Sequence, residues 1–183
     1  FPEIVNNIES LNNIQKLILP GVGSFDACME TLQISRLDEA IKDYVYSKKL
    51  SILGICAGMQ ILFDKSEEGK SKGLSLLKGT VVSLRSKCLT EQRIPHISIK
   101  AINNLHSFNG GKYSKIVRDK EYIYFTHSYA VVDTIENADI GYTFLDKTSF
   151  VGMIKKNNIW GIQGHPEKSH DAGSRILKMF VDS

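Results

Sequence analysis

The stretch from Ser51 to Phe63 limits the possible folds more than any other part of the chain. An apolar run leads into Cys56, Gly54 and Gly58 flank the cysteine, and a second apolar run of helical character follows. Glycines permit a sharp bend and close approach of neighbouring backbone, so we predict a strand, a tight turn carrying Cys56, and a helix through Phe63. A cysteine at a helix N-terminus would be favoured as thiolate, the nucleophilic form. The alternative is a structural cysteine buried in a glycine-rich turn.

Composition narrows the class of protein. A chain of 183 residues suffices for one domain, residues 1–183, with a full core, and a net charge of +3 is too small to indicate nucleic acid binding. No apolar run approaches the roughly 20 residues of a membrane span, and no secretory signal is recognised. The three cysteines (Cys28, Cys56, Cys88) include no C-x-x-C pair. We therefore predict a cytoplasmic protein with one reactive cysteine, no metal site and no cofactor.

The first third of the chain alternates strand and helix. Residues 16–20 form a short apolar run that Pro20 ends, and residues 25–32 follow as a helix with Ser24 or Asp26 as its cap. Residues 37–48 show apolar spacing of three and four, typical of a second helix, and lead into the strand before Cys56. This alternation indicates a parallel sheet covered by helices.

The later part of the chain changes character. Short aromatic or β-branched runs predict successive strands at 79–84, 94–102, 122–131, 140–145, 150–155 and 158–162, and a closing helix is predicted at 172–181. Strands that follow strands extend a sheet in antiparallel fashion. The predicted fold is α/β: a mixed, largely parallel sheet with helices on both faces.

His165 is the candidate base for cysteine chemistry. Pro166 favours an extended conformation at His165, and in an extended segment Glu167 lies on the same side as the His165 ring. Cys56, His165 and Glu167 then have the roles of nucleophile, general acid/base and orienting group. The alternative is an exposed His-Pro-Glu turn.

Acyl chemistry also requires an oxyanion hole. The N–H of Ala57, directly after the nucleophile, is one candidate donor. The turn Pro20-Gly21-Val22-Gly23 follows a predicted strand at the sheet edge where ligand sites collect, and its glycines would let a peptide N–H point into the site. The alternative is a simple turn.

Five motifs in order resemble the class I (triad) glutamine amidotransferases, a flavodoxin-like fold, and most closely the glutaminase subunit of imidazole glycerol phosphate synthase. They are Pro20-Gly21-Val22-Gly23-Ser24-Phe25, Gly54-Ile55-Cys56-Ala57-Gly58-Met59-Gln60, Ser66-Glu67-Glu68-Gly69, Thr126-His127-Ser128-Tyr129 and Gly164-His165-Pro166-Glu167-Lys168-Ser169. The resemblance implies that Cys56 attacks glutamine to form a thioester, with His165 and Glu167 completing the triad. It implies that the backbone N–H groups of Val22 and Ala57 hold the oxyanion.

The resemblance also implies a binding set for the amino-acid end of glutamine. Its members are Gly23, Gln60, Glu68, Ser128 and Tyr129. A carboxylate such as Glu68 suits the substrate ammonium, whereas the alternative is that Glu67 and Glu68 form a solvated charge pair. His127 stays outside the predicted catalytic set.

The implied partner is a barrel-shaped cyclase subunit, which forms a heterodimer with the glutaminase, activates it and consumes its ammonia in histidine biosynthesis. The family usually reads Pro-His-Met-Gly-Trp-Asn at the docking face, where this chain has Pro95-His96-Ile97-Ser98-Ile99-Lys100. This departure favours a paralogue that feeds a surface-sugar amidotransferase as an alternative. Further alternatives are a cysteine hydrolase of the same fold and an inactive binding module.

Two other departures concern the site and the sheet. Ala57 replaces a usual Leu and Gly164 a usual Phe, which predicts a looser site or different gating. The family's first strand and helix, a D-Y-G-x-G-N-like segment, is not recognised in this chain, and its lack would leave an exposed sheet edge.

Overall fold

The computed structural model describes residues 2–47, 50–87 and 93–183. Lys48, the predicted end of the second helix, and Cys88 lie outside these residues. The strands are β1 (Lys16–Gly21), β2 (Ser51–Cys56), β3 (Lys65–Ser66), β4 (Thr80–Ser83), β5 (His96–Ile102), β6 (Glu121–His127), β7 (Tyr129–Ala130), β8 (Asp139–Leu145), β9 (Thr148–Lys156) and β10 (Ile159–Ile162). The helices are α1 (Phe25–Ile34), α2 (Leu37–Ser47), α3 (Ala57–Gln60), α4 (Leu84–Lys87) and α5 (His170–Val181), with 3-10 turns η1 (Glu9–Leu11), η2 (Leu105–Gly111) and η3 (Pro166–Lys168).

The main sheet has the strand order β1-β2-β10-β9-β8 within the described residues. β1, β2 and β10 run parallel, and β9 and β8 continue the sheet antiparallel. The register pairs Gly21 with Cys56 and Ile162 with Ile55. The carboxyl ends of three parallel strands therefore meet around Cys56, which is where ligand sites form in α/β sheets.

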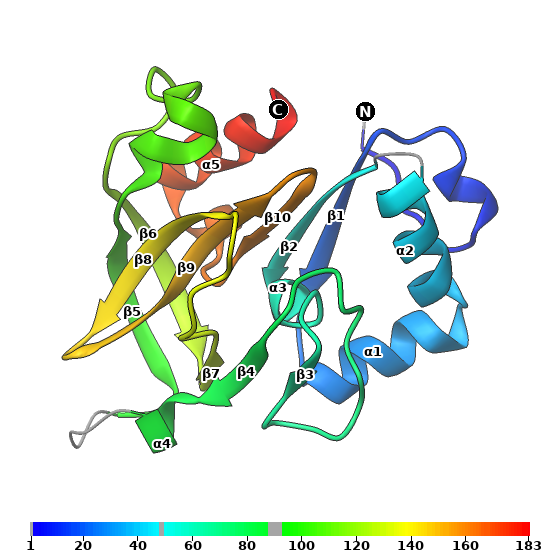
Figure 1. Ribbon diagram of the computed structural model, residues 1–183, viewed down its shortest axis with the longest axis horizontal. Helices are drawn as coiled ribbons and strands as arrows, with labels where there is room; N and C mark the ends of the chain where they lie inside the picture. Colours follow the sequence, from blue (N-terminus) through cyan, green and yellow to red (C-terminus); the bar gives the residue numbers. More distant parts are fainter. Residues whose placement is uncertain (1, 48–49, 88–92) are drawn as a thin grey trace.

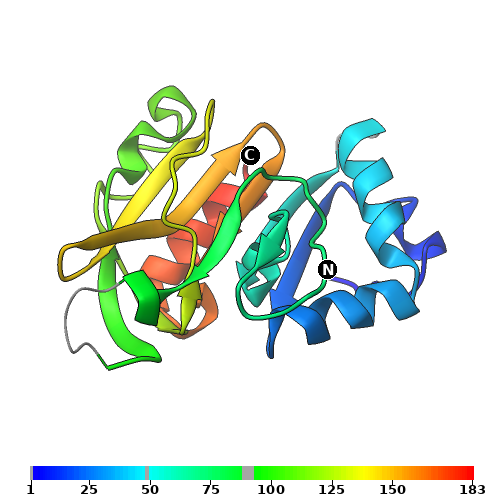
Figure 2. The same cartoon turned by 60° about the horizontal axis from the view of Figure 1, so that its bottom comes forward.

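Adjacent residues of β2 enter different cores. Ile52 packs in a cluster with α1 and α2, whereas Leu53 packs in a second cluster with Trp160 and α5. Successive side chains of a strand point to opposite faces, so the two clusters are the two covered faces of the sheet. Figures 1 and 2 show α1 and α2 together beside β1 and β2, and α5 on the side of β5 and β6. The predicted mixed sheet with helices on both faces is confirmed.

Two smaller sheets stand beside the main one. β3-β4-β7 forms one of them, and the antiparallel pair β5-β6 forms the other, with His96 opposite His127. The segment predicted as one strand over 122–131 is thus split between β6 and β7. The sequence pattern predicts the strands other than the two-residue β3, but it carries no record of which strands pair, so these separate sheets were not predicted.

α3 is shorter than predicted, because it ends at Gln60 and not at Phe63. The carbonyls of the next residues bond another segment instead of continuing the helix: Leu74 N–H donates to Ile61 O and Leu77 N–H donates to Leu62 O. Competition from this loop overrides the helical propensity of the apolar run.

The caps and turns follow the sequence closely. Ser24 accepts a hydrogen bond from the Ala27 N–H at the start of α1, while Asp26 accepts from the N–H groups of Lys70 and Ser71. Of the two predicted caps, Ser24 is the one used.

None of the helices within the described ranges has the length and apolar character needed to cross a membrane.

Candidate active site

Cys56 ends β2 in a strained conformation. Its φ is +54° and ψ −115°, in a region that residues other than glycine rarely adopt. Glycine makes the turn possible: a Cβ on Gly58 would lie 1.9 Å from Leu19 O, and one on Gly54 would lie 2.4 Å from Gly58 O. The predicted tight strand-turn-helix carrying the cysteine is confirmed.

The helix N-terminus favours the thiolate through the Ala57 N–H, but burial outweighs it, so the expected thiolate is not the resting form. Burial raises the pKa of the Cys56 thiol to about 11; the Ala57 N–H opposes the rise, and the charge of Glu167 adds to it. α3 has a single turn, so few peptide dipoles align behind the sulfur. The resting group is a thiol, and its proton must be removed by a base during the reaction.

His165 is held in place by two contacts. Its N–H donates to Tyr124 O over 2.8 Å, and its ring Nδ1 lies 2.7 Å from Glu167 Oε1. His165 is extended, as Pro166 predicts, but Glu167 reaches the ring through the turn η3 and not through a continuing strand. Nδ1 therefore donates to the carboxylate, and Nε2, which is buried without a partner among the described atoms, keeps its lone pair.

Gln163 joins this segment to Cys56. It follows the end of β10, is fully buried, and places its Nε2 3.9 Å from Cys56 Sγ. Its Oε1 accepts from Gln60 Nε2 over 3.1 Å. Parallel pairing of β10 with β2 brings the His165 segment and the cysteine to the same sheet edge.

The predicted binding residues lie around the same edge. Gln60 is buried and its Nε2 donates to Tyr129 O over 2.9 Å, so two members of the set are in contact. Ser128 O accepts from Leu84 N–H, which ties this segment to α4. The Ser128-Tyr129 backbone is thus fixed on both sides.

Glu68 is anchored at the start of α1. Its Oε2 accepts from the Phe25 N–H over 2.8 Å, and the Glu67 carboxylate accepts from the Ser83 N–H over 2.7 Å. Both carboxylates are exposed but each holds a backbone group, so they are more than a solvated pair. The Glu68 loop lies beside the turn that follows β1.

That turn contains Val22 and Gly23. The Val22 side chain is exposed, Gly23 has φ +122°, and the preceding residue, Gly21, pairs with Cys56. The turn is therefore next to the nucleophile, as an oxyanion donor requires. Orientation of the Val22 N–H toward the oxyanion stays a prediction.

Gly164 does not loosen the site. A Cβ there would lie 2.4 Å from Ile123 Cγ2 and 3.0 Å from Tyr124 O, so β6 fills the space that a larger residue would occupy. Ala57 is likewise buried. The expectation of a looser site is therefore wrong at Gly164, where β6 occupies the space of the missing side chain, and at Ala57 it stays a prediction.

The sequence analysis did not identify Gln163 or His96 as site residues. It also did not predict that His127 points inward. Gln163 is two residues before His165. Residues two apart in an extended segment share a face, and this spacing was the signal in the sequence that could have placed Gln163 near His165. His96 and His127 pair across β5 and β6, which depends on register. Within the described ranges, no group of three or more His, Cys, Asp or Glu side chains is arranged to hold a metal ion.

Comparison with known proteins gives the family. The profile described as "Glutamine amidotransferase class-I" matches residues 2–183. This chain is a class-I glutamine amidotransferase. The chain is 37% identical to "Imidazole glycerol phosphate synthase subunit HisH" of Helicobacter hepaticus over 98% of its length and 81% of the relative. It is 43% identical to the protein of that name from Sulfurimonas denitrificans over 91% of its length and 78% of the relative.

The solved structures agree on the amidotransferase fold. One described as "Crystal structure of glutamine amidotransferase" superposes with a TM-score of 0.74 at 16% identity, covering 97% of this chain and 83% of that one. The α/β arrangement of the class-I amidotransferase is therefore shared at low sequence identity.

Proposed function

We propose that this class-I amidotransferase is the glutaminase subunit of an imidazole glycerol phosphate synthase in histidine biosynthesis, hydrolysing L-glutamine to glutamate and ammonia. Near-full-length similarity to proteins of that name supports the pathway. The observation that supports the chemistry is that Cys56 ends β2, that the segment carrying the His165–Glu167 pair follows the adjacent parallel strand β10, and that Gln163 of this segment contacts Cys56 Sγ. We further propose that residues 1–183 act as one domain in the cytoplasm.

In the first half-reaction His165 Nε2 takes the Cys56 thiol proton as Sγ attacks the side-chain amide carbon of glutamine. The N–H groups of Ala57 and Val22 stabilise the resulting oxyanion. The carbon–nitrogen bond then breaks, and His165 returns the proton to the nitrogen, which leaves as ammonia. Glu167 keeps the imidazole oriented and stabilises its protonated form throughout.

In the second half-reaction water hydrolyses the thioester. His165 Nε2 removes a proton from the water, the oxygen attacks the acyl carbon, and the carbon–sulfur bond breaks to release glutamate. The proton returns to Cys56 Sγ. Gln60 Oε1 and Glu68 hold the substrate ammonium at the far end, where acceptors and a negative charge suit a cation.

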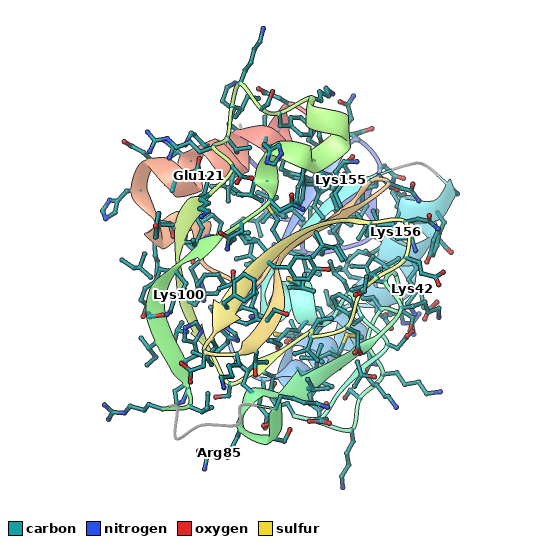
Figure 3. All side chains as sticks on the ribbon, turned by 60° about the vertical axis from the view of Figure 1, so that its left-hand side comes forward. Lys42, Arg85, Lys100, Glu121, Lys155 and Lys156 are labelled. Carbon is teal, nitrogen blue, oxygen red and sulfur yellow. The ribbon has the colours of Figure 1, made fainter. Side chains whose placement is uncertain are left out.

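The ammonia passes to a barrel-shaped cyclase subunit. The β5 strand offers a surface for it: Ile97 and Ile99 are 59% and 65% exposed, and Tyr122 on the paired strand β6 is 62% exposed. Exposed apolar side chains gathered on one sheet surface are typical of a protein interface. Lys100, labelled on the same strand in Figure 3, alternates with these isoleucines and belongs to the opposite face of β5.

The test measures ammonia released from glutamine by the chain alone and with a histidine-pathway cyclase subunit and its ribotide ligand. We expect low activity alone, strong stimulation by the liganded partner, and none in either case with Cys56→Ser. Cys56→Ser should keep the circular-dichroism spectrum of the parent. Activity that ignores the partner would support the surface-sugar paralogue, which the altered residues 97–100 favour, and no ammonia at all would refute glutaminase function.

A further inference from the structure

Two buried histidines lie behind the glutamine-binding residues, and the mechanism above does not use them. His96 on β5 and His127 on β6 are directly opposite in register, with His96 Nδ1 3.2 Å from His127 Nε2. Their exposed fractions are 3% and 6%. Phe125 and Phe150 pack against both rings. A buried polar pair in an aromatic setting requires that each ring nitrogen find a partner.

A backbone carbonyl determines where the hydrogens lie. His127 Nδ1 is 2.9 Å from Tyr129 O, and because a carbonyl only accepts, Nδ1 carries the hydrogen. Burial lowers the pKa of His127 to about 3 and also lowers that of His96, so both rings are neutral. His127 Nε2 then accepts from His96 Nδ1, and His96 Nε2 accepts from the Ser98 hydroxyl over 2.7 Å.

The same carbonyl orients Gln60. Tyr129 O accepts from Gln60 Nε2 as well as from His127, so both of its lone pairs are engaged. The second hydrogen of Gln60 Nε2 goes to Gln163 Oε1. With both amide hydrogens used, Oε1 is the atom of the Gln60 amide left to accept from a ligand.

We propose that His96 and His127 are positioning residues for substrate recognition: they hold the Tyr129 carbonyl so that it turns Gln60 Oε1 toward the α-ammonium of glutamine. The proposal rests on the proposed function, since it takes glutamine as the substrate. The chain of hydrogen bonds begins at Ser98, which lines a surface hollow on β5 with Pro95 and Lys100. A contact that displaces the Ser98 hydroxyl therefore reaches the glutamine site through hydrogen bonds.

The test compares glutamine with glutaramate, the same molecule without its α-amino group. Binding is measured by calorimetry in a Cys56→Ala background, which cannot turn over. His96→Phe keeps an aromatic ring in the Phe125 and Phe150 cluster but removes the donor to His127. His96→Asn is the matched control, because its side-chain N–H occupies the place of Nδ1.

In the parent we expect glutamine to bind more tightly than glutaramate. His96→Phe should weaken glutamine binding about tenfold and glutaramate binding less than about twofold, because an unpaired buried acceptor disturbs only the ammonium subsite. His96→Asn should stay within about twofold of the parent for both ligands, and urea unfolding should be two-state in all variants.

Three results for the variants would overturn the proposal. They are an equal loss for both ligands in His96→Phe, no loss for either, and the same glutamine-specific loss in His96→Asn. A parent that does not distinguish the two ligands would also refute it, because Gln60 would then not read the ammonium. Ammonia release by the unmodified chain decides the proposed function separately.

Discussion

The raised pKa of Cys56 gives a direct prediction for the isolated chain. Burial moves the thiol from its ordinary pKa of 9.0 to about 11. At pH 8 the thiolate is then about one molecule in a thousand, compared with about one in ten for an unperturbed thiol. The isolated glutaminase should be a poor nucleophile at neutral pH for this reason.

The assay is alkylation by iodoacetamide as a function of pH. A Cys28→Ser, Cys88→Ser background leaves Cys56 as the single thiol of the sequence. The rate constant should rise about tenfold for each pH unit from 7 to 10, without levelling, because only thiolate reacts. N-acetylcysteine, measured in parallel, should level off at lower pH.

Glu167→Gln supplies a second check. Burial is the largest cause of the raised pKa and is unchanged by this substitution, but the negative charge that adds to it is removed. The alkylation curve should therefore move slightly to lower pH. A curve for the parent that levels off near pH 8 would refute the reasoning, because it would show that burial does not control the thiol.

Other predictions concern the scaffold and the docking surface. Glu121 is buried beside α5 (Figure 3), and Arg175→Met removes the bidentate partner of its carboxylate. This substitution should lower the free energy of unfolding by about 3 kcal/mol in urea titrations at pH 7.5. A loss under about 1 kcal/mol would contradict this expectation. Gly164→Phe, the residue usual in the family, should cost about 2 kcal/mol or more in the same titration, and an unchanged midpoint would show that β6 can make room. Ile99→Asp should abolish stimulation by the cyclase partner and leave basal ammonia release unchanged, whereas Tyr46→Asp on α2 should affect neither.

The pH dependence of the Glu121 contribution follows from its environment. Burial alone would raise the pKa of this carboxyl, but hydrogen bonds from Arg175 and from the Arg118 N–H hold it below its ordinary value of 4.5. A carboxyl with a lowered pKa stabilises the fold fully above the unfolded pKa, and this contribution is lost as pH falls through the folded value. As pH falls below about 4.5, part of the decrease in the parent's free energy of unfolding should therefore come from protonation of Glu121. Arg175→Met should not show this part of the decrease.

Much of the fold was predictable from the sequence because it rests on local signals. Alternation of strand and helix in the first third, the glycines around Cys56 and the Ser24 cap each involve residues close in the chain. The length of α3 was not predictable from the sequence, because the carbonyls of residues 61 and 62 accept hydrogen bonds from the N–H groups of residues 74 and 77. No local pattern records such a competitor.

The sequence alone determined the family, the α/β class and the residues proposed as the triad, because these depend on short motifs whose chemistry is local. The tertiary structure decided what surrounds them. The raised pKa of Cys56 depends on desolvation by segments distant in the chain, and the His96–His127 pair depends on the register of β5 against β6. Proton affinity and hydrogen-bond direction are set by neighbours in space, so only the assembled fold could fix them.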